Sequence, residues 1–233
     1  MTPEAAALTD LERDALTELV NIGVSRAAAA LRKMIGEQVL LSVPAVEAMD
    51  RAAAATLIGE RESDHLVAVK QDFSGALSGR AMLIFPQASS LALVRAVAGD
   101  AVSADEVADL EEEALAETGN VILNRCLGTM ANMLHRSLAL SLPEVLRGDG
   151  AHLFRFDAPQ PDDGLVLFLY INFFVKNRNI RGYIAMLLDL PSLAALKALV
   201  AEFIQTALGE AEPSAPLDKT FQAGTFEAGA LQE

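Results

Sequence analysis

One segment of this chain occurs twice. The eight residues 14–21, DALTELVN, return ninety-nine positions later as residues 113–120, EALAETGN. A proline follows the final asparagine of each copy at the same distance of twenty-three residues, at Pro44 and at Pro143. Two copies of one sequence unit are expected to fold into two similar structural units, each with a similar buried side and a similar exposed side. This repeat therefore constrains the fold more than any other feature of the sequence.

The two copies stay parallel beyond these prolines. Each contains an alternating apolar run followed by a glycine-led run, at residues 65–73 and 79–85 in the first copy and 165–174 and 182–188 in the second. Alternation with a period of two predicts strands, and two neighbouring runs joined by a short connection predict a hairpin. Pro86 and Pro191 then open a helix in each half, as proline in a first helical turn allows.

These patterns predict an α+β fold with a pseudo-two-fold internal repeat. We expect a largely antiparallel central sheet, with the two long repeat helices side by side on one of its faces. No polar linker separates the halves, which predicts a single domain over residues 1–208 made of two repeats, at about 8–100 and 105–208. Residues 209–233 carry proline, glycine and charge without periodicity, and are predicted to be a disordered tail.

On a helical wheel the repeated glutamate and asparagine fall on the polar side. In the first helix the predicted buried face is Leu16, Val20, Gly23, Ala27, Ala30 and Met34, and the exposed face is Asp14, Glu18, Asn21 and Ser25. In the second helix the buried face is Leu115, Gly119, Ile122, Cys126 and Met133, and the exposed face is Glu113, Glu117, Asn120 and Asn124. A single such pair is usually no more than solvated surface; its duplication with the distant proline favours a functional site.

Composition excludes several classes of function. The formal net charge of −14 argues against binding to nucleic acid or to an anionic membrane, which need basic clusters. No apolar run approaches the roughly 20 residues that span a bilayer, and the N-terminus lacks the pattern of a signal peptide, so we expect a soluble cytoplasmic protein. The three histidines and the single Cys126 do not have the spacing of a zinc site, and we expect this cysteine to have a packing role.

The repeated pattern, Asp/Ser-x3-Glu-x2-Asn-x22-Pro, resembles the signature of the CheC, CheX and FliY phosphatases. The first copy meets it at Asp14, Glu18, Asn21 and Pro44, and the second at Glu117, Asn120 and Pro143. The second copy departs from it at Glu113, where the family has Asp or Ser, a position that we expect to cap or position the start of its helix. Two copies in one chain resemble the CheC branch of the family.

The resemblance implies a hydrolase of chemotaxis and two-component signalling that removes the aspartyl phosphate of a CheY-like response regulator. Asn21 and Asn120 would orient the attacking water, and Glu18 and Glu117 would pair with the lysine of the regulator's active site. The chain would need no cofactor of its own, because the regulator holds the Mg²⁺.

Two questions stay open at the level of sequence. The same fold could grip a phosphorylated regulator without hydrolysing anything, which is the main alternative to an enzyme. The resemblance also implies a complex with a CheD-like receptor deamidase, for which the residues themselves give no independent indication. The sequence does not rank the activities of the two sites.

Overall fold

The computed structural model describes residues 8–43, 46–62, 65–99, 104–155, 165–175 and 178–210. The elements of the first half are α2 (Asp10–Ile35), β1 (Val39–Ser42), β2 (Val46–Asp50), α3 (Arg51–Arg61), β3 (Leu66–Gly75), β4 (Gly79–Pro86) and α4 (Gln87–Ala98). Those of the second half are α5 (Ala104–Met133), β5 (Leu138–Leu140), β6 (Glu144–Gly148), α6 (Gly150–Leu153), β7 (Leu165–Val175), β8 (Arg178–Leu188) and α7 (Leu190–Glu210). The same succession of helices and strands therefore occurs in both halves.

The described strands form one sheet in which every pairing is antiparallel. Its order is β1-β7-β8-β4-β3-β5, with β2 also paired to β7 and β6 also paired to β3. The counterparts in the two halves are β1 and β5, β3 and β7, and β4 and β8. When each strand is replaced by its counterpart, the order read from one edge equals the order read from the other. The first two strands of each half therefore pair with a long strand of the other half: β1 and β2 pair with β7, and β5 and β6 pair with β3. The α+β class and the largely antiparallel sheet are confirmed, while an exact two-fold relation between the halves stays a prediction.

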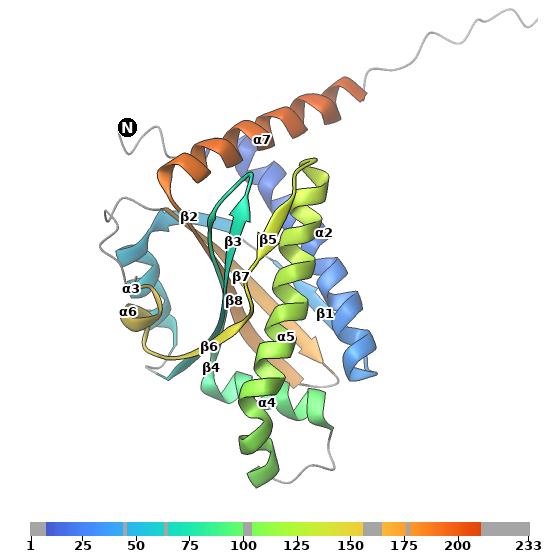
Figure 1. Cartoon of the computed structure of the whole chain (residues 1–233), viewed down its shortest axis with the longest axis vertical. Helices are drawn as coiled ribbons and strands as arrows, with labels where there is room; N and C mark the ends of the chain where they lie inside the picture. Colours follow the sequence, from blue (N-terminus) through green and yellow to red (C-terminus); the bar gives the residue numbers. More distant parts are fainter. Residues whose placement is uncertain are drawn as a thin grey trace, which may run out of the picture.

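Helices cover both faces of the sheet (Figure 1). The long helices α2 and α5 lie side by side on one face, as predicted. They run in opposite directions, and α3 and α6 lie on the other face. Successive residues of a strand point to opposite faces. Accordingly Val67 and Val69 of β3 belong to the core under α2 and α5, and Leu66 and Ala68 belong to the core under α3 and α6.

Helix α2 begins at a complete capping box. The backbone N–H of Thr9 donates to the Glu12 carboxylate at 2.7 Å, and the backbone N–H of Glu12 donates to Thr9 Oγ1 at 3.2 Å. Such a box satisfies backbone groups that the first helical turn leaves unpaired. The predicted capping role for Asp14 and Glu113 is therefore wrong, because Asp14 lies a full turn inside α2 and Glu113 lies well inside α5.

Six short elements were not predicted from the sequence: β1, β2, α3, β5, β6 and α6. Helix α3 is capped by Asp50, whose carboxylate accepts from the backbone N–H of Ala53 at 2.7 Å, and it buries Ala54 and Ile58. The predicted tail boundary at residue 209 is also two residues too early, because α7 ends at Glu210. The remainder of that predicted tail lies outside the described residues.

Helix α7 bears on the expectation that no apolar run is long enough to span a membrane. Its segment Leu190–Ala207 is long and apolar enough, by length and composition alone, to cross a membrane, although only 28% of that segment is buried in the structure. Its Leu193, Leu196 and Val200 are buried in the protein. A core helix of a globular protein meets the same criterion, so the finding is weak evidence for a membrane span.

Two glycines set how closely the central helices approach their neighbours. A Cβ atom at Gly23 of α2 would lie 2.9 Å from the backbone oxygen of Cys126 in α5. A Cβ atom at Gly119 of α5 would lie 2.5 Å from the side chain of Val69 in β3. Glycine therefore allows α5 to pack directly against both α2 and the strand beneath it. At this contact Cys126 is fully buried, and burial raises the pKa of its thiol to about 12.

We predict that Gly119→Ala destabilises the protein by about 1–3 kcal/mol, because the added methyl group overpacks the contact with Val69. Gly128→Ala on the same helix is the matched control, since a Cβ there meets nothing within 4 Å. The control should be neutral or stabilising by up to about 1 kcal/mol, through helix propensity alone. Urea unfolding of both variants measures the difference; equal stabilities would contradict the close α5–β3 packing.

We predict that Cys126 is unreactive in the folded protein, because its thiol is both buried and protonated at neutral pH. An aromatic disulfide reagent at about pH 8 should label the thiol only after unfolding in denaturant. Rapid labelling of the native protein would show that this part of the α2–α5 contact is open to solvent.

Candidate functional site

The four predicted site residues lie on the two central helices. Glu18 and Glu117 are exposed, whereas Asn21 and Asn120 are half-buried at the margins of α2 and α5. In each helix the glutamate and asparagine lie within one turn, so a ligand at the helix surface can meet both. Each pair is held by a buried stripe on the opposite side, which in α2 includes Leu16, Leu19 and Val20.

The first pair borders an apolar groove. The groove begins at Ser25, one turn beyond Asn21, and continues between α2 and β1 along Ala28, Ala29, Arg32, Lys33, Val39, Leu40 and Leu41. Its volume is about 590 Å³, and Leu40 in its wall is 54% exposed. Within the part of the chain that the structure describes, the side chains of Glu18 and Asn21 make no hydrogen bond or ion pair with another side chain, which leaves both groups available to a partner.

The asparagine of the second pair is hydrogen-bonded to the sheet through its side-chain oxygen. Asn120 Oδ1 accepts a hydrogen bond from Nε2 of Gln71 in β3 at 3.2 Å, and another from the side-chain amide of Asn124 one turn along α5. Gln71 Nε2 also donates to the backbone oxygen of Ser141 at 2.8 Å. Two hydrogen bonds hold Ser141 beside Asp72. The backbone N–H of Ser141 donates to the backbone oxygen of Asp72, and the backbone N–H of Asp72 donates to Ser141 Oγ.

In the second copy this network connects the asparagine of the motif to the segment that precedes the distant proline. Ser141 lies two residues before Pro143, at the end of β5, so the segment leading to the distant proline reaches the asparagine through Gln71. The sequence analysis missed Gln71. The available signal was a polar residue between Val69 and Phe73, on a face of β3 that is otherwise apolar.

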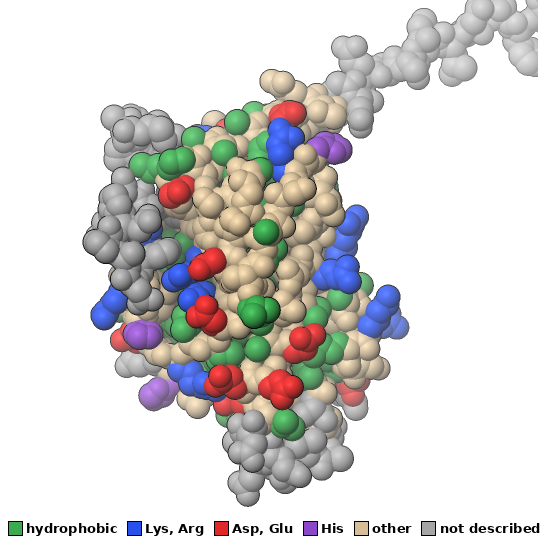
Figure 2. Space-filling view, viewed as in Figure 1, with side chains coloured by type: hydrophobic (Ala, Val, Ile, Leu, Met, Phe, Trp, Pro, Cys, Tyr) green, Lys and Arg blue, Asp and Glu red, His purple; other side chains and the backbone are tan. Residues whose placement is uncertain are grey.

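Acidic side chains gather over the N-terminal half of α5, below its largely uncharged C-terminal half (Figure 2). Part of this charge is paired, because Arg147 of β6 lies 3.3 Å from Glu111 and 3.4 Å from Glu112. Glu113 and Glu117 are exposed on the same helix. A cationic group of a partner would be attracted to this end of α5.

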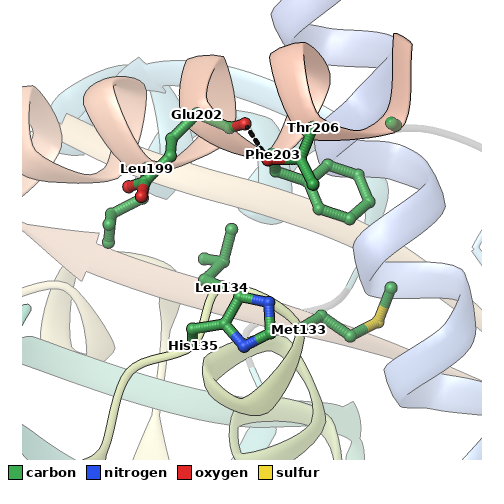
Figure 3. A pocket seen from close by; sticks show the side chains of 8 residues that line it. Met133, Leu134, His135, Leu199, Glu202, Phe203 and Thr206 are labelled. Carbon is green, nitrogen blue, oxygen red and sulfur yellow. Dashed lines mark hydrogen bonds between the residues drawn. The ribbon is translucent and has the colours of Figure 1, made fainter. Parts of the chain in front are cut away.

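A separate pocket lies at the other end of α5, near the start of the connection to β5 (Figure 3). It has a volume of about 200 Å³ and is lined by Met133, Leu134, His135, Leu199, Glu202, Phe203, Thr206 and Ala207. None of the four predicted site residues contributes to it. Among the described residues there is also no group of three or more histidine, cysteine, aspartate or glutamate side chains that could hold a metal ion.

Comparison with known proteins supports the family resemblance. The sequence profile of the CheC-like family matches residues 11–47, which contain Glu18, Asn21 and Pro44. The flagellar motor switch phosphatase FliY of Bacillus subtilis is 24% identical over 145 residues, a match that covers 61% of this chain. The chain spans only 37% of the length of that relative.

Solved structures share the fold. The crystal structure of Thermotoga maritima FliY superposes with a TM-score of 0.66 at 16% identity, over 84% of this chain and 99% of that one. The FliM middle domain of H. pylori gives a TM-score of 0.53 at 9% identity, over 82% of this chain and 99% of that one. At these identities the likeness concerns the fold alone. The matched motif, the related sequence and the shared fold all agree with a resemblance to the CheC-like family.

Proposed function

We propose that this chain is a phosphatase that hydrolyses the aspartyl phosphate of a CheY-like response regulator. The observation that carries the proposal is the duplicated pair of an exposed glutamate and a half-buried asparagine on the outer side of α2 and of α5. The match of the CheC-like family to the segment around the first pair supports it. We propose that the protein acts in the cytoplasm, where such regulators work.

In this mechanism the asparagines position water. An amide is too weakly basic to remove a proton, but it can hold a water molecule by hydrogen bonding in line with the phosphorus atom. The water oxygen bonds to phosphorus as the bond to the aspartate oxygen breaks, and the aspartate leaves as a carboxylate. The proton of the water passes to phosphate or solvent. Catalysis of this kind consists mainly of placement and charge stabilisation.

The glutamates act in docking. Glu18 and Glu117 are exposed carboxylates one turn before their asparagines, where they can pair with a lysine of the regulator's active site. That contact would fix the register of the helix in the phosphorylation cleft. The Mg²⁺ that activates the acyl phosphate belongs to the regulator, and this chain contributes no cofactor in the proposal.

The groove beside the first pair offers further contact area to the same partner. It begins one turn from Asn21 and combines the exposed apolar Leu40 with the cationic Arg32 and Lys33. An apolar centre with a polar rim is typical of the contact surfaces between proteins.

The alternative is a binding module that holds a phosphorylated regulator without hydrolysing it. The shared fold of FliM is compatible with this alternative, because FliM has been solved in a complex with FliG and one fold can host different functions. A complex with a CheD-like deamidase stays a prediction from the family resemblance. Retention of both Glu/Asn pairs favours the enzyme.

We predict that Asn21→Ala and Asn120→Ala each remove the activity of one site, by about a hundredfold or more at that site, since the attacking water loses its position. The double variant should leave only the regulator's own rate of dephosphorylation. Phosphate release from a phosphorylated CheY-like regulator with Mg²⁺ measures both effects.

Asn132→Ala is the matched control for these substitutions, because Asn132 is an exposed asparagine near the end of α5 and outside both pairs. It should keep the rate of the wild-type protein. A double variant that still accelerates release would contradict the water-positioning role. A wild-type protein that accelerates no regulator would favour the binding module.

We predict that Glu18→Lys in an Asn120→Ala background raises KM for the phosphorylated regulator by about tenfold and changes kcat less, because charge reversal acts on docking. The weakening should be largest at low ionic strength, where an exposed ion pair is least screened. Glu60→Lys is the control, since Glu60 is exposed on α3 across the sheet. An unchanged KM for Glu18→Lys, measured by the same phosphate assay, would contradict the docking role.

A further inference from the structure

Gln71 is a buried polar residue that faces the second site. Its exposed fraction is 0%, and it lies on the side of β3 that also carries Val69 and Phe73, under α5. A buried amide costs roughly 1–3 kcal/mol for each hydrogen-bonding group left without a partner. Its Oε1 atom has no hydrogen-bond partner in the described structure, so the side chain is retained at some cost to stability.

The orientation of this amide is fixed by the backbone. Ser141 O is a carbonyl oxygen and can only accept, so the group of Gln71 that lies 2.8 Å from it must be the NH₂. The same NH₂ reaches Asn120 at 3.2 Å, and the atom of Asn120 that faces it must therefore be the acceptor Oδ1. The hydrogen bonds thus run in one direction, from Gln71 to Ser141 and to Asn120.

Asn124 completes the environment of Asn120. Its side-chain amide donates to the same Oδ1 atom, so two donors occupy the two lone pairs of that oxygen. The Nδ2 group of Asn120 remains as the part of the amide that is available to a ligand. The second site therefore presents an oriented hydrogen-bond donor.

The first site has different residue types at the corresponding positions. The repeat places Ser25 where the second copy has Asn124. Ser42 is the counterpart of Ser141 in the repeat. Ser141 lies beside Asp72, and Ser42 pairs with Asn172, so Asn172 corresponds to Asp72. The residue before each of these gives the next correspondence, in which Ile171 matches Gln71. The sequence of the first site therefore has an apolar residue type where the second has an amide.

We propose that Gln71 is a positioning residue that orients Asn120, so that the second site is preorganised and turns over faster than the first. This inference rests on the proposed function and adds to it a ranking of the two sites. The Nδ2 group of Asn120 donates to the oxygen of the attacking water, whose remaining lone pair bonds to phosphorus. Prior orientation of the amide lowers the entropic cost of holding that water in line.

The test separates the sites with the variants Asn21→Ala and Asn120→Ala, each in the full chain. With only the second site intact, Gln71→Leu should lower kcat for phosphate release by about tenfold and leave KM within about twofold. With only the first site intact, the same substitution should leave kcat unchanged. Asn124→Ser, which gives the second site the residue of the first, is an exposed change and should lower kcat of the second site alone.

Each outcome decides between defined alternatives. Equal losses of kcat in both backgrounds would assign Gln71 a purely structural role and overturn the inference. An active second site that is indifferent to both Gln71→Leu and Asn124→Ser would also overturn it, and so would a first site that is faster than the second. A wild-type protein that accelerates no regulator would instead overturn the proposed function, and the inference with it.

Discussion

The close contact of α5 with both α2 and β3 is the constraint on which the candidate sites depend. Gly23 and Gly119 allow it, because a side chain at either position would collide with the neighbouring backbone or with Val69. With α5 this close to the strand, the amide of Gln71 reaches Asn120 directly. A looser contact would leave the asparagine on an ordinary solvated helix. The packing of small residues and the chemistry of the second site are thus parts of one arrangement.

The chain carries two similar Glu/Asn pairs, one on α2 and one on α5, but the residues that surround the two pairs differ. The first pair adjoins an open groove with an exposed leucine and two cationic side chains at its margin. The second lies on an acidic stretch of α5, and its asparagine is hydrogen-bonded to the sheet. The groove adds apolar contact area beside the first pair, and hydrogen bonds to the sheet hold the asparagine of the second pair. Divergence after duplication can change such surroundings without changing the motif itself.

Much of the fold could be predicted from sequence because it follows from periodicity. Alternating apolar runs gave the paired strands, and the helical spacing of Leu16, Val20 and Gly23 gave the buried side of α2. The short helix α3 was missed because its alanine-rich sequence carries no strong pattern. The capping role assigned to Glu113 was wrong because the start of a helix depends on local hydrogen bonds, such as the box at Thr9, which a motif alignment does not contain.

The site could be predicted only in part. The Glu/Asn pairs stand out through their repetition, and their partial exposure follows from the wheel. The contribution of Gln71 could not be predicted, because it depends on strand register and on the distance between β3 and α5. A polar residue on an apolar face of a strand can pair with many groups, and only the three-dimensional structure shows that its partners are Asn120 and Ser141.

The most direct test of the central claim is the single-turnover decay of a phosphorylated CheY-like regulator mixed with an excess of the wild-type chain in water labelled with heavy oxygen. The account predicts a decay rate that rises with chain concentration, saturates above the regulator's own rate, and places the label from water in the released phosphate. A complex that forms while the decay rate stays the same or falls would contradict it, and would identify the chain as a module that binds the phosphorylated regulator and protects it.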